Sequence, residues 1–234
     1  MTIMRANGKT VGLAISALLI AGCGETPPPA GEEAVVEQAA ARDPQPMAFG
    51  RFVPEREDDF TWENDKVAFR VYGPNSSGKG PVSGVDPWFK KVPYPIVDKW
   101  YAEHQQGKSY HVDHGEGHDI YHVGPSRGVG GTAVWIDGAP YPAAMFESHE
   151  VLQSGGDVVE FTLQYEWDTP LGAVAERKTI SLEMGSQLYH VNSVFMLDGE
   201  PAALALAIGR STQDGKARVL SKTHTGRIST REGM

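Results

Sequence analysis

The sequence contains a single cysteine, Cys23, so an intrachain disulfide and a cysteine zinc cluster are both excluded. It also lacks a long hydrophobic run. The most apolar stretch, residues 11–21, is too short to span a bilayer as a helix. Finally, no stretch carries a long amphipathic helical stripe, which excludes a helical bundle.

Basic residues are in deficit, with 21 Lys and Arg against 30 Asp and Glu and a formal net charge of −9. An acidic protein is a poor nucleic-acid partner, because neutralisation of phosphates supplies most of that affinity. Only the end of the chain is basic. We predict that residues 213–234 form a poorly ordered or aberrant tail, because they contain few large apolar side chains.

The beginning of the sequence predicts export. Arg5 and Lys9 precede the apolar run, which ends in Ile20-Ala21-Gly22-Cys23, the pattern of a bacterial lipobox. Residues 1–23 are therefore predicted to be a lipoprotein signal peptide with lipidation at Cys23. Residues 24–48, rich in Pro, Ala and Glu, are predicted to be a flexible tether. These features place the protein in the cell envelope, lipid-anchored to the membrane on its periplasmic side or in the outer membrane.

The remaining sequence alternates with a period of two, which is typical of antiparallel strands with one buried face. Val67, Phe69 and Val71, for example, fall on one face of a strand. Residues 49–212 are therefore predicted to form a mainly β domain, an antiparallel β-sandwich with a long Gly/His-rich loop insertion. The predicted strands cover residues 66–72, 132–136, 149–153, 157–167, 173–183, 187–197 and 202–208, with a short helix or helical turn at 100–105.

The loop insertion, residues 73–131, concentrates the reactive side chains. Its part SYHVDHGEGHDIYHVGPSRGVGG, residues 109–131, contains four histidines and six glycines. Glycine permits tight turns, so these side chains can converge. One hypothesis is a divalent metal bound by His111, His114 and His118, with Glu116 nearby. We predict no other cofactor.

A second hypothesis is acid–base chemistry without metal. Breaking a C–O bond beside a sugar carboxylate needs a base, a group that neutralises the carboxylate, and an acid for the leaving oxygen. We assign proton transfer to His111 and His114 and the carboxylate contact to Arg127, with Glu116 and Tyr94 as orienting groups in the catalytic set. Lysines and further aromatic and polar side chains are predicted to bind substrate: Asn64, Trp88, Lys91, Tyr110, Asp119 and Tyr121.

A third hypothesis is binding without catalysis. Several aromatic residues precede the histidine-rich segment, and aromatic faces stack on sugar rings. The alternative is that these aromatic side chains belong to the core or support the loop.

Several segments are similar to those of one bacterial family. Trp62-Glu63-Asn64-Asp65, Ala68 to Pro74, and Val92 to Tyr101 resemble the "domain of unknown function 4861" family, and Tyr110 to Gly117 with Val123 to Gly128 resembles its central signature. The resemblance implies an exported protein that accompanies the breakdown of acidic polysaccharides. It also implies a galactose-mutarotase-like super-sandwich, a fold shared with epimerases and polysaccharide lyases. It carries no catalytic assignment.

These observations together predict a protein that acts on uronic-acid oligosaccharides, as a lyase, dehydratase or epimerase at the carbon next to the carboxylate. The alternative is a non-catalytic, lipid-anchored carbohydrate-binding module. The expected partners are an acidic oligosaccharide and, through the N-terminal lipid, the membrane. Because the charge balance changes after Arg210, we also expect a truncation or foreign sequence beyond that point.

Overall fold

The structure is a computed structural model, which describes residues 44–76, 83–123, 126–209, 218–222 and 227–231. Cys23, the predicted signal peptide and most of the predicted tether lie outside these residues. Within them, no helix is long and apolar enough to cross a membrane.

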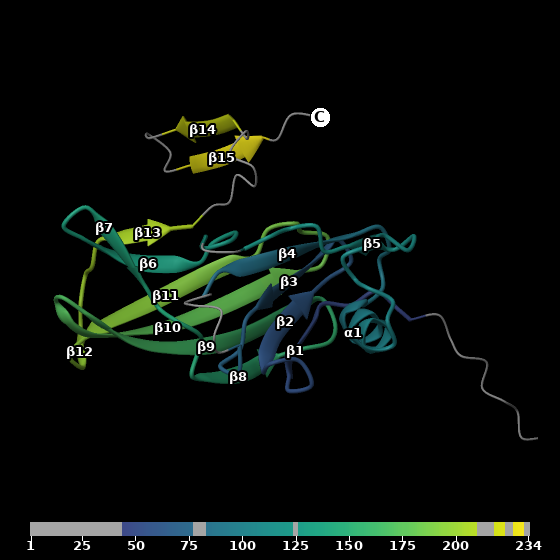
Figure 1. Ribbon diagram of the computed structural model, residues 1–234, viewed down its shortest axis with the longest axis horizontal. Coiled ribbons are helices and arrows are strands. Elements are labelled where there is room, and N and C mark those ends of the chain that lie inside the picture. The colour runs from purple at the N-terminus through teal and green to yellow at the C-terminus, as the bar shows by residue number, and fades with distance from the viewer. Residues whose placement is uncertain (1–43, 77–82, 124–125, 210–217, 223–226, 232–234) are drawn as a thin grey trace, which may run out of the picture. The chain divides into compact units, whose positions relative to one another are not determined.

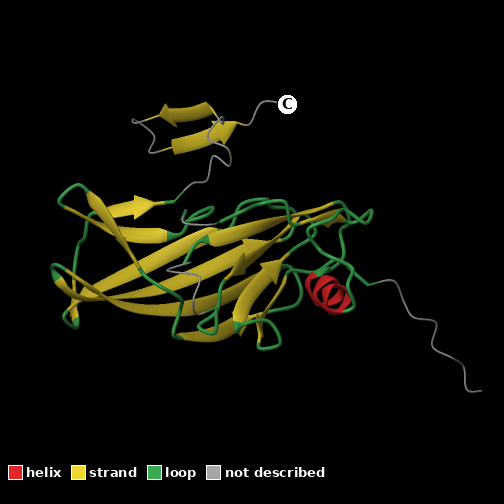
Figure 2. Cartoon of the chain, in the orientation of Figure 1, coloured by secondary structure: helices red, strands yellow, loops and turns green. Residues whose placement is uncertain are grey.

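Antiparallel strands dominate the described residues, and α1 (Val97–Gln105) is the one α-helix among them (Figure 2). This confirms the predicted mainly β fold class. The first sheet is a meander of five strands, listed here in spatial order: β1 (Phe49–Val53), β2 (Asp59–Glu63), β3 (Val67–Val71), β4 (Val85–Lys90) and β5 (Gly117–His118) (Figure 1).

The second sheet also has five antiparallel strands, in the spatial order β12 (Glu200–Pro201), β11 (His190–Leu197), β10 (Gly172–Glu183), β9 (Val158–Thr169) and β8 (Ser148–Gln153). A third sheet has the order β13 (Leu206–Ile208), β6 (Thr132–Ile136) and β7 (Ala139–Pro142). Finally, β14 (Arg218–Lys222) pairs with β15 (Arg227–Arg231) as a hairpin. The predicted tail thus contains two paired strands.

The main core lies between the first and second sheets. Trp62, Phe69 and Val85 from one sheet share a buried cluster with Phe161 and Ile180 from the other. This packing is that of a β-sandwich. Alternation explains it, because every second residue of β2, β3 and β9 is apolar and faces inward. The predicted face of Val67, Phe69 and Val71 is confirmed as part of this core.

The outer face of the first sheet is covered as well. Trp88 on β4 packs against Ile96, Trp100 and Tyr101 of the α1 region and against Tyr110 of the following loop. For this reason all five residues of β3 are buried, although the strand alternates in character. The sequence interval predicted as one long loop insertion therefore contains two strands of this sheet, β4 and β5, together with α1. The α1 region and Tyr110 cover the outer face of the sheet.

Most predicted strands are confirmed, within a few residues at their ends. The β8–β9 hairpin turns at Gly155 and Gly156, whose φ angles of 86° and 108° are readily adopted only by glycine. Asp137 and Gly138 join β6 to β7 with φ angles of 48° and 85°, as expected for a tight hairpin turn. The strands that were not predicted are β1, β2, β4, β5, β7, β12, β14 and β15.

Candidate functional site

The outer face of the first sheet carries a buried charge cluster. Arg70 on β3 and Asp86 on β4 are directly opposed in the strand register. Arg70 Nη2 donates to Asp86 Oδ2 at 2.5 Å and lies 3.4 Å from Asp119 Oδ2. The three side chains are at most 3% exposed. One guanidinium thus bridges two carboxylates in a dry environment, where charge interactions are strong.

His111 extends this cluster to the surface. Its Nδ1 lies 3.2 Å from the backbone oxygen of Asp119 and 3.4 Å from Oδ2 of the same residue, while the side chain is 48% exposed. A backbone oxygen can only accept, so Nδ1 carries the proton. The neutral ring therefore has an unprotonated Nε2, which has no hydrogen-bond partner among the described residues.

We call these four residues, Arg70, Asp86, Asp119 and His111, the Arg70 cluster. The pKa values of its two carboxyl groups are shifted. Burial and the charge of Asp86 raise the pKa of Asp119 to about 6, against the opposing charges of Arg70 and His111. Burial likewise raises the pKa of Asp86, and the Arg70 guanidinium opposes this. Perturbed carboxyls beside an exposed imidazole are a common feature of acid–base sites.

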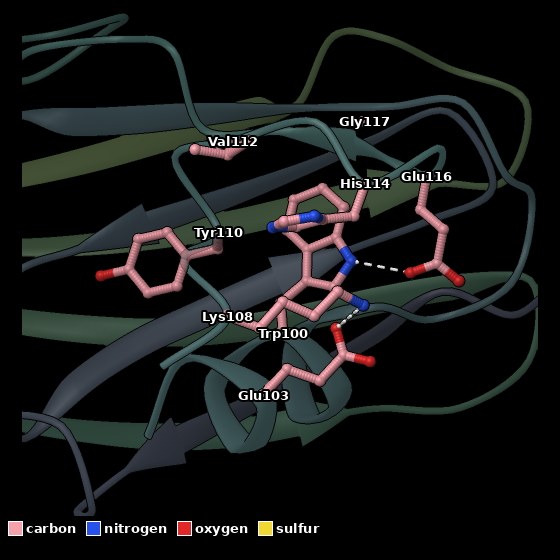
Figure 3. Close-up of a pocket in the computed structure, with 8 residues that line it drawn as sticks. All are labelled: Trp100, Glu103, Lys108, Tyr110, Val112, His114, Glu116 and Gly117. Carbon is pink, nitrogen blue, oxygen red and sulfur yellow. Dashed lines mark hydrogen bonds and ion pairs between the residues drawn. The ribbon is translucent and has the colours of Figure 1, made fainter. Parts of the chain in front are cut away.

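A small depression lies beside the Arg70 cluster, between α1 and the loop that follows it. Trp100 forms its floor, and Tyr110, His114 and Glu116 are among its lining residues (Figure 3). The empty space, including the part open to solvent, is about 230 Å³. The part that a water-sized molecule can occupy is only about 10 Å³, so the depression is a shallow feature of the surface.

Glu116 holds the loop against α1. Its carboxylate accepts hydrogen bonds from Tyr94 Oη, from Lys99 Nζ at 2.5 Å and from Trp100 Nε1 at 3.1 Å. Burial raises the pKa of Glu116, but the bonds from Lys99, Tyr94 and Trp100 outweigh it and leave the pKa below its usual value. Glu116 is thus an ionised anchor, and Tyr94 supports it.

A second buried ion pair positions α1. The carboxylate of Glu63 on β2 accepts the backbone N–H groups of Ile96 at 2.9 Å and Val97 at 2.9 Å, at the beginning of the helix. Lys90 Nζ donates to the same carboxylate at 2.7 Å. A carboxylate at a helix N-terminus satisfies otherwise unpaired N–H groups and interacts favourably with the helix dipole.

At its other end, α1 presents His104 beside the Arg70 cluster. Gly107, with φ of 92°, follows the C-cap residue and ends the helix. His104 lies in the last turn, and its ring is 4.3 Å from that of Tyr110 and 6.2 Å from that of His111, between centroids. Burial and the charges of His111, Arg56 and Arg70 lower the pKa of His104.

The metal hypothesis does not fit the described geometry. Among the described residues, no group of three or more His, Cys, Asp and Glu side chains is placed to hold an ion. His114 Nε2 bonds the backbone oxygen of Ser109 at 3.1 Å, His111 faces Asp119, and His118 lies on β5 opposite Phe89. The histidines therefore do not converge on one cavity, because each is directed by its own stretch of backbone.

Arg127 lies beside the beginning of β4, where its backbone oxygen accepts from Val85 N at 3.3 Å. It donates to Ser83 Oγ at 2.6 Å. Lys178 lies on β10, on the inner face of the second sheet. Burial lowers its pKa and the charge of Arg127 lowers it further, so the Arg127 guanidinium lies near Lys178. His111 is on the outer face of the first sheet. The guanidinium beside His111 is instead that of Arg70, which is buried.

The predicted substrate-binding residues have different environments. Asn64 is fully buried and bonds backbone groups on both sides, including Glu183 O at 2.5 Å, so its role is structural. Trp88 is buried under α1 and offers no stacking face. Lys91 is exposed and pairs with Asp113. The buried members are Tyr110, Asp119 and Tyr121, and the hydroxyl of Tyr121 has no partner among the described residues.

The sequence reasoning missed the charged residues that lie under the loop. Glu63, Arg70, Asp86 and Lys90 occupy alternate positions on β2, β3 and β4, and they share one sheet face. Charged residues at these positions are usually interpreted as a solvated face. The detectable signal was the presence of both charge signs at paired positions of neighbouring strands. His104 was missed because it lies outside the histidine-rich segment.

The structure thus defines an antiparallel β-sandwich with a helix and loop over a charged sheet face. Residues 24–232 match the family described as "Domain of unknown function (DUF4861)", and the chain belongs to this family. The match includes the residues after Arg210, so the expectation of foreign sequence there is not supported.

One curated relative is "Uncharacterized protein P7" of Formosa agariphila, 40% identical over 191 residues. The alignment covers 77% of this chain and 47% of the relative, so the chain spans about half the length of the curated relative it matches. No solved structure matches the chain significantly.

Proposed function

We propose that this protein is an exported carbohydrate-processing protein that acts on uronic-acid oligosaccharides. The reaction is elimination, dehydration or epimerisation at the carbon next to the carboxylate. Lipidation at Cys23 would hold the protein in the cell envelope, on its periplasmic side or in the outer membrane. The substrate class is the one that the family resemblance implies.

The observation that carries this proposal is the environment of His111. Its Nδ1 proton is directed at Asp119, and its exposed ring offers Nε2 to a ligand. A carboxylate or carbonyl behind an imidazole fixes the tautomer and orientation that proton transfer needs. The proton next to a carboxylate is weakly acidic and the leaving oxygen needs a proton, so a positioned imidazole is a suitable proton-transfer group for this reaction.

Charges around the depression suit an acidic ligand. Lys99 and Lys108 are partly exposed at its edge, and Lys108 pairs with Glu103 at 2.7 Å. An ammonium group has three donors, so each lysine can bond a substrate carboxylate while it keeps its protein partner. This assigns to lysines the role that the sequence reasoning gave to Arg127.

The test is direct incubation with saturated and unsaturated uronic oligosaccharides, followed by mass spectrometry and ultraviolet absorbance. Elimination creates a double bond conjugated to the carboxylate and raises the absorbance, whereas dehydration also lowers the mass by one water. Epimerisation leaves the mass unchanged and is read by NMR. Absence of every product with all substrates refutes the enzymatic proposal.

The alternative, a non-catalytic carbohydrate-binding module, has one observation in its favour. His111 and His114, the two predicted proton-transfer groups, each bond a different backbone oxygen, Asp119 O and Ser109 O. Binding measured by calorimetry, with no product formed from the same oligosaccharides, would favour this alternative.

A further inference from the structure

We propose that His104, at the end of α1, is the second proton-transfer group of the site and forms an acid–base pair with His111. This inference rests on the proposed function and adds to it a catalytic residue. It replaces His114, which the sequence reasoning assigned to proton transfer and whose Nε2 bonds the backbone oxygen of Ser109.

The first observation is the separation of the two rings. Their centroids are 6.2 Å apart, and the ring planes are nearly perpendicular at 86°. In an elimination the base contacts a proton and the acid contacts the leaving oxygen, each at roughly 3 Å. Two imidazoles at this separation can therefore act on neighbouring atoms of one sugar ring.

The second observation is that both rings have a common support. Tyr110 packs against His104 at 4.3 Å and against His111 at 4.5 Å, between centroids. Tyr110 is itself fixed, because its ring stacks on the buried Trp88 and its hydroxyl accepts a bond from Arg70 at 3.2 Å. A rigid support holds acid and base at a constant spacing, which is what catalytic geometry requires.

The third observation is that the two rings differ in their surroundings. Within the described residues, neither ring nitrogen of His104 has a hydrogen-bond partner, and its side chain is exposed. His111 faces the carboxylate of Asp119 and forms an ion pair with it when protonated. The charged and titratable groups near the pair include Arg56, Arg70, Asp86, Tyr110 and Asp119.

These surroundings assign the roles. Burial and three neighbouring positive charges lower the pKa of His104, so its neutral ring is available as the base. His111 is the acid, with Nδ1–H directed at Asp119 and Nε2–H directed at the leaving oxygen. Different environments for two neighbouring titratable groups are typical of acid–base pairs, because they favour different protonation states.

The proposed step balances. The C–H bond beside the carboxylate breaks, and its proton goes to a nitrogen of His104. The electron pair of that bond forms a C–C double bond, while the C–O bond breaks and its electrons remain on the leaving oxygen. That oxygen takes the Nε2 proton of His111. One proton has moved from His111 to His104, and exchange with water restores both rings without a redox partner.

The experiment compares the full chain with His104→Gln, His111→Gln and the double variant. His122→Gln is the matched control, because His122 is an exposed histidine of the same loop. We expect each single variant to lower kcat at least ~100-fold with a small change in KM. The double variant should lose little more, because the pair acts as a unit. The control should stay within about 2-fold of the parent.

A second readout separates this inference from the proposed function. NMR titration of the imidazole resonances needs no substrate. His111→Gln should raise the titration midpoint of His104, because the charge of His111 is removed, whereas His122→Gln should not.

If the parent protein turns over uronic oligosaccharides but His104→Gln keeps its full kcat, the pair is refuted and the proposed function stands. If the parent shows no turnover, the proposed function fails. The pair is then supported when the two histidines titrate interdependently and refuted when they do not.

Discussion

Arg70 and Asp86 face each other across β3 and β4, with Nη2 and Oδ2 2.5 Å apart, on the sheet face that the helix and loop cover. A buried ion pair of this kind adds little net stability compared with apolar residues, but it is costly to break. It lies beneath Asp119 and His111, so it helps to fix the carboxyl that faces the imidazole.

The pH dependence of stability reports on Asp119. Its pKa in the folded protein, about 6, lies above the ordinary value of 3.8, so folding favours the protonated form. The contribution of Asp119 to stability is present below about pH 4 and is lost as the pH rises through about 6. We therefore expect the free energy of unfolding of Asp119→Asn, relative to the parent protein, to rise from about pH 4.5 to about pH 7.5, by up to about 2 kcal/mol. Urea titrations at both pH values measure this.

The control for Asp119 is Asp168→Asn, an exposed aspartate on β9. Its stability relative to the parent protein should be the same at both pH values. If the relative free energy of unfolding of Asp119→Asn were also the same at both pH values, the prediction for Asp119 would be wrong.

Replacement of Glu63 tests how α1 is positioned. In Glu63→Gln the ammonium of Lys90, which is buried, loses its counter-charge, and the helix N-terminus loses a carboxylate. We expect a loss of roughly 3–5 kcal/mol in the free energy of unfolding. The double variant with Lys90→Gln should lose less than the sum of the single changes. Glu166→Gln, on an exposed position of β9, is the control and should change stability by less than about 0.5 kcal/mol.

Two glycines of the loop form a matched pair. A Cβ at Gly117 would lie 1.9 Å from the backbone oxygen of Phe89, whereas a Cβ at Gly115 meets nothing within 4 Å. Both have positive φ, 106° and 101°, so both alanine variants are strained. Gly117→Ala additionally pushes β5 from β4. We expect it to be less stable than Gly115→Ala by at least about 1 kcal/mol. Equal thermal melting of the two would contradict the described β4–β5 pairing.

The roles of Arg127 and His111 can be distinguished by measuring the activity of variants. Because Arg127 lies near Lys178 and Ser83, we expect Arg127→Lys to keep kcat within about 3-fold, whereas His111→Gln lowers it ~100-fold or more. Steady-state kinetics on a uronic oligosaccharide measure both. Comparable losses in the two variants would restore the hypothesis that Arg127 grips the substrate carboxylate.

Chelation tests the placement of the histidines. His111 and His114 each direct one ring nitrogen at a backbone oxygen, and the described residues offer no set of three ligands. We expect dialysis against a chelator to leave both the melting temperature and the turnover unchanged. A fall that added divalent metal restores would contradict this.

Local pattern predicted much of the fold. Period-two alternation and paired glycines located β3, β6 and the β8–β9–β10 meander, because a strand with one apolar face can be buried in only one way. The alternation did not predict β2 and β4, because Glu63, Asp86 and Lys90 interrupt the apolar pattern there. These strands are buried on both faces, and their charged side is stabilised by partners distant in the sequence.

The candidate site was predicted only in part. The histidine-rich segment was predicted to carry the site, and within it His111 and Asp119 lie together. The side chain of Arg127, close to them in sequence, bonds Ser83 Oγ, whereas Arg70 and His104 reach them from β3 and α1. Sequence distance does not indicate such contacts, because a glycine-rich loop can direct neighbouring side chains to opposite faces.

The amino-acid sequence by itself determined that this protein is built of antiparallel strands, because alternating side chains and turn glycines act within a few residues. The tertiary structure alone decided which imidazole meets a carboxylate and which guanidinium lies beneath it. Those contacts depend on a helix and a loop that pack on one face of a sheet, where burial of Trp88 and pairing of Arg70 with Asp86 fix their position.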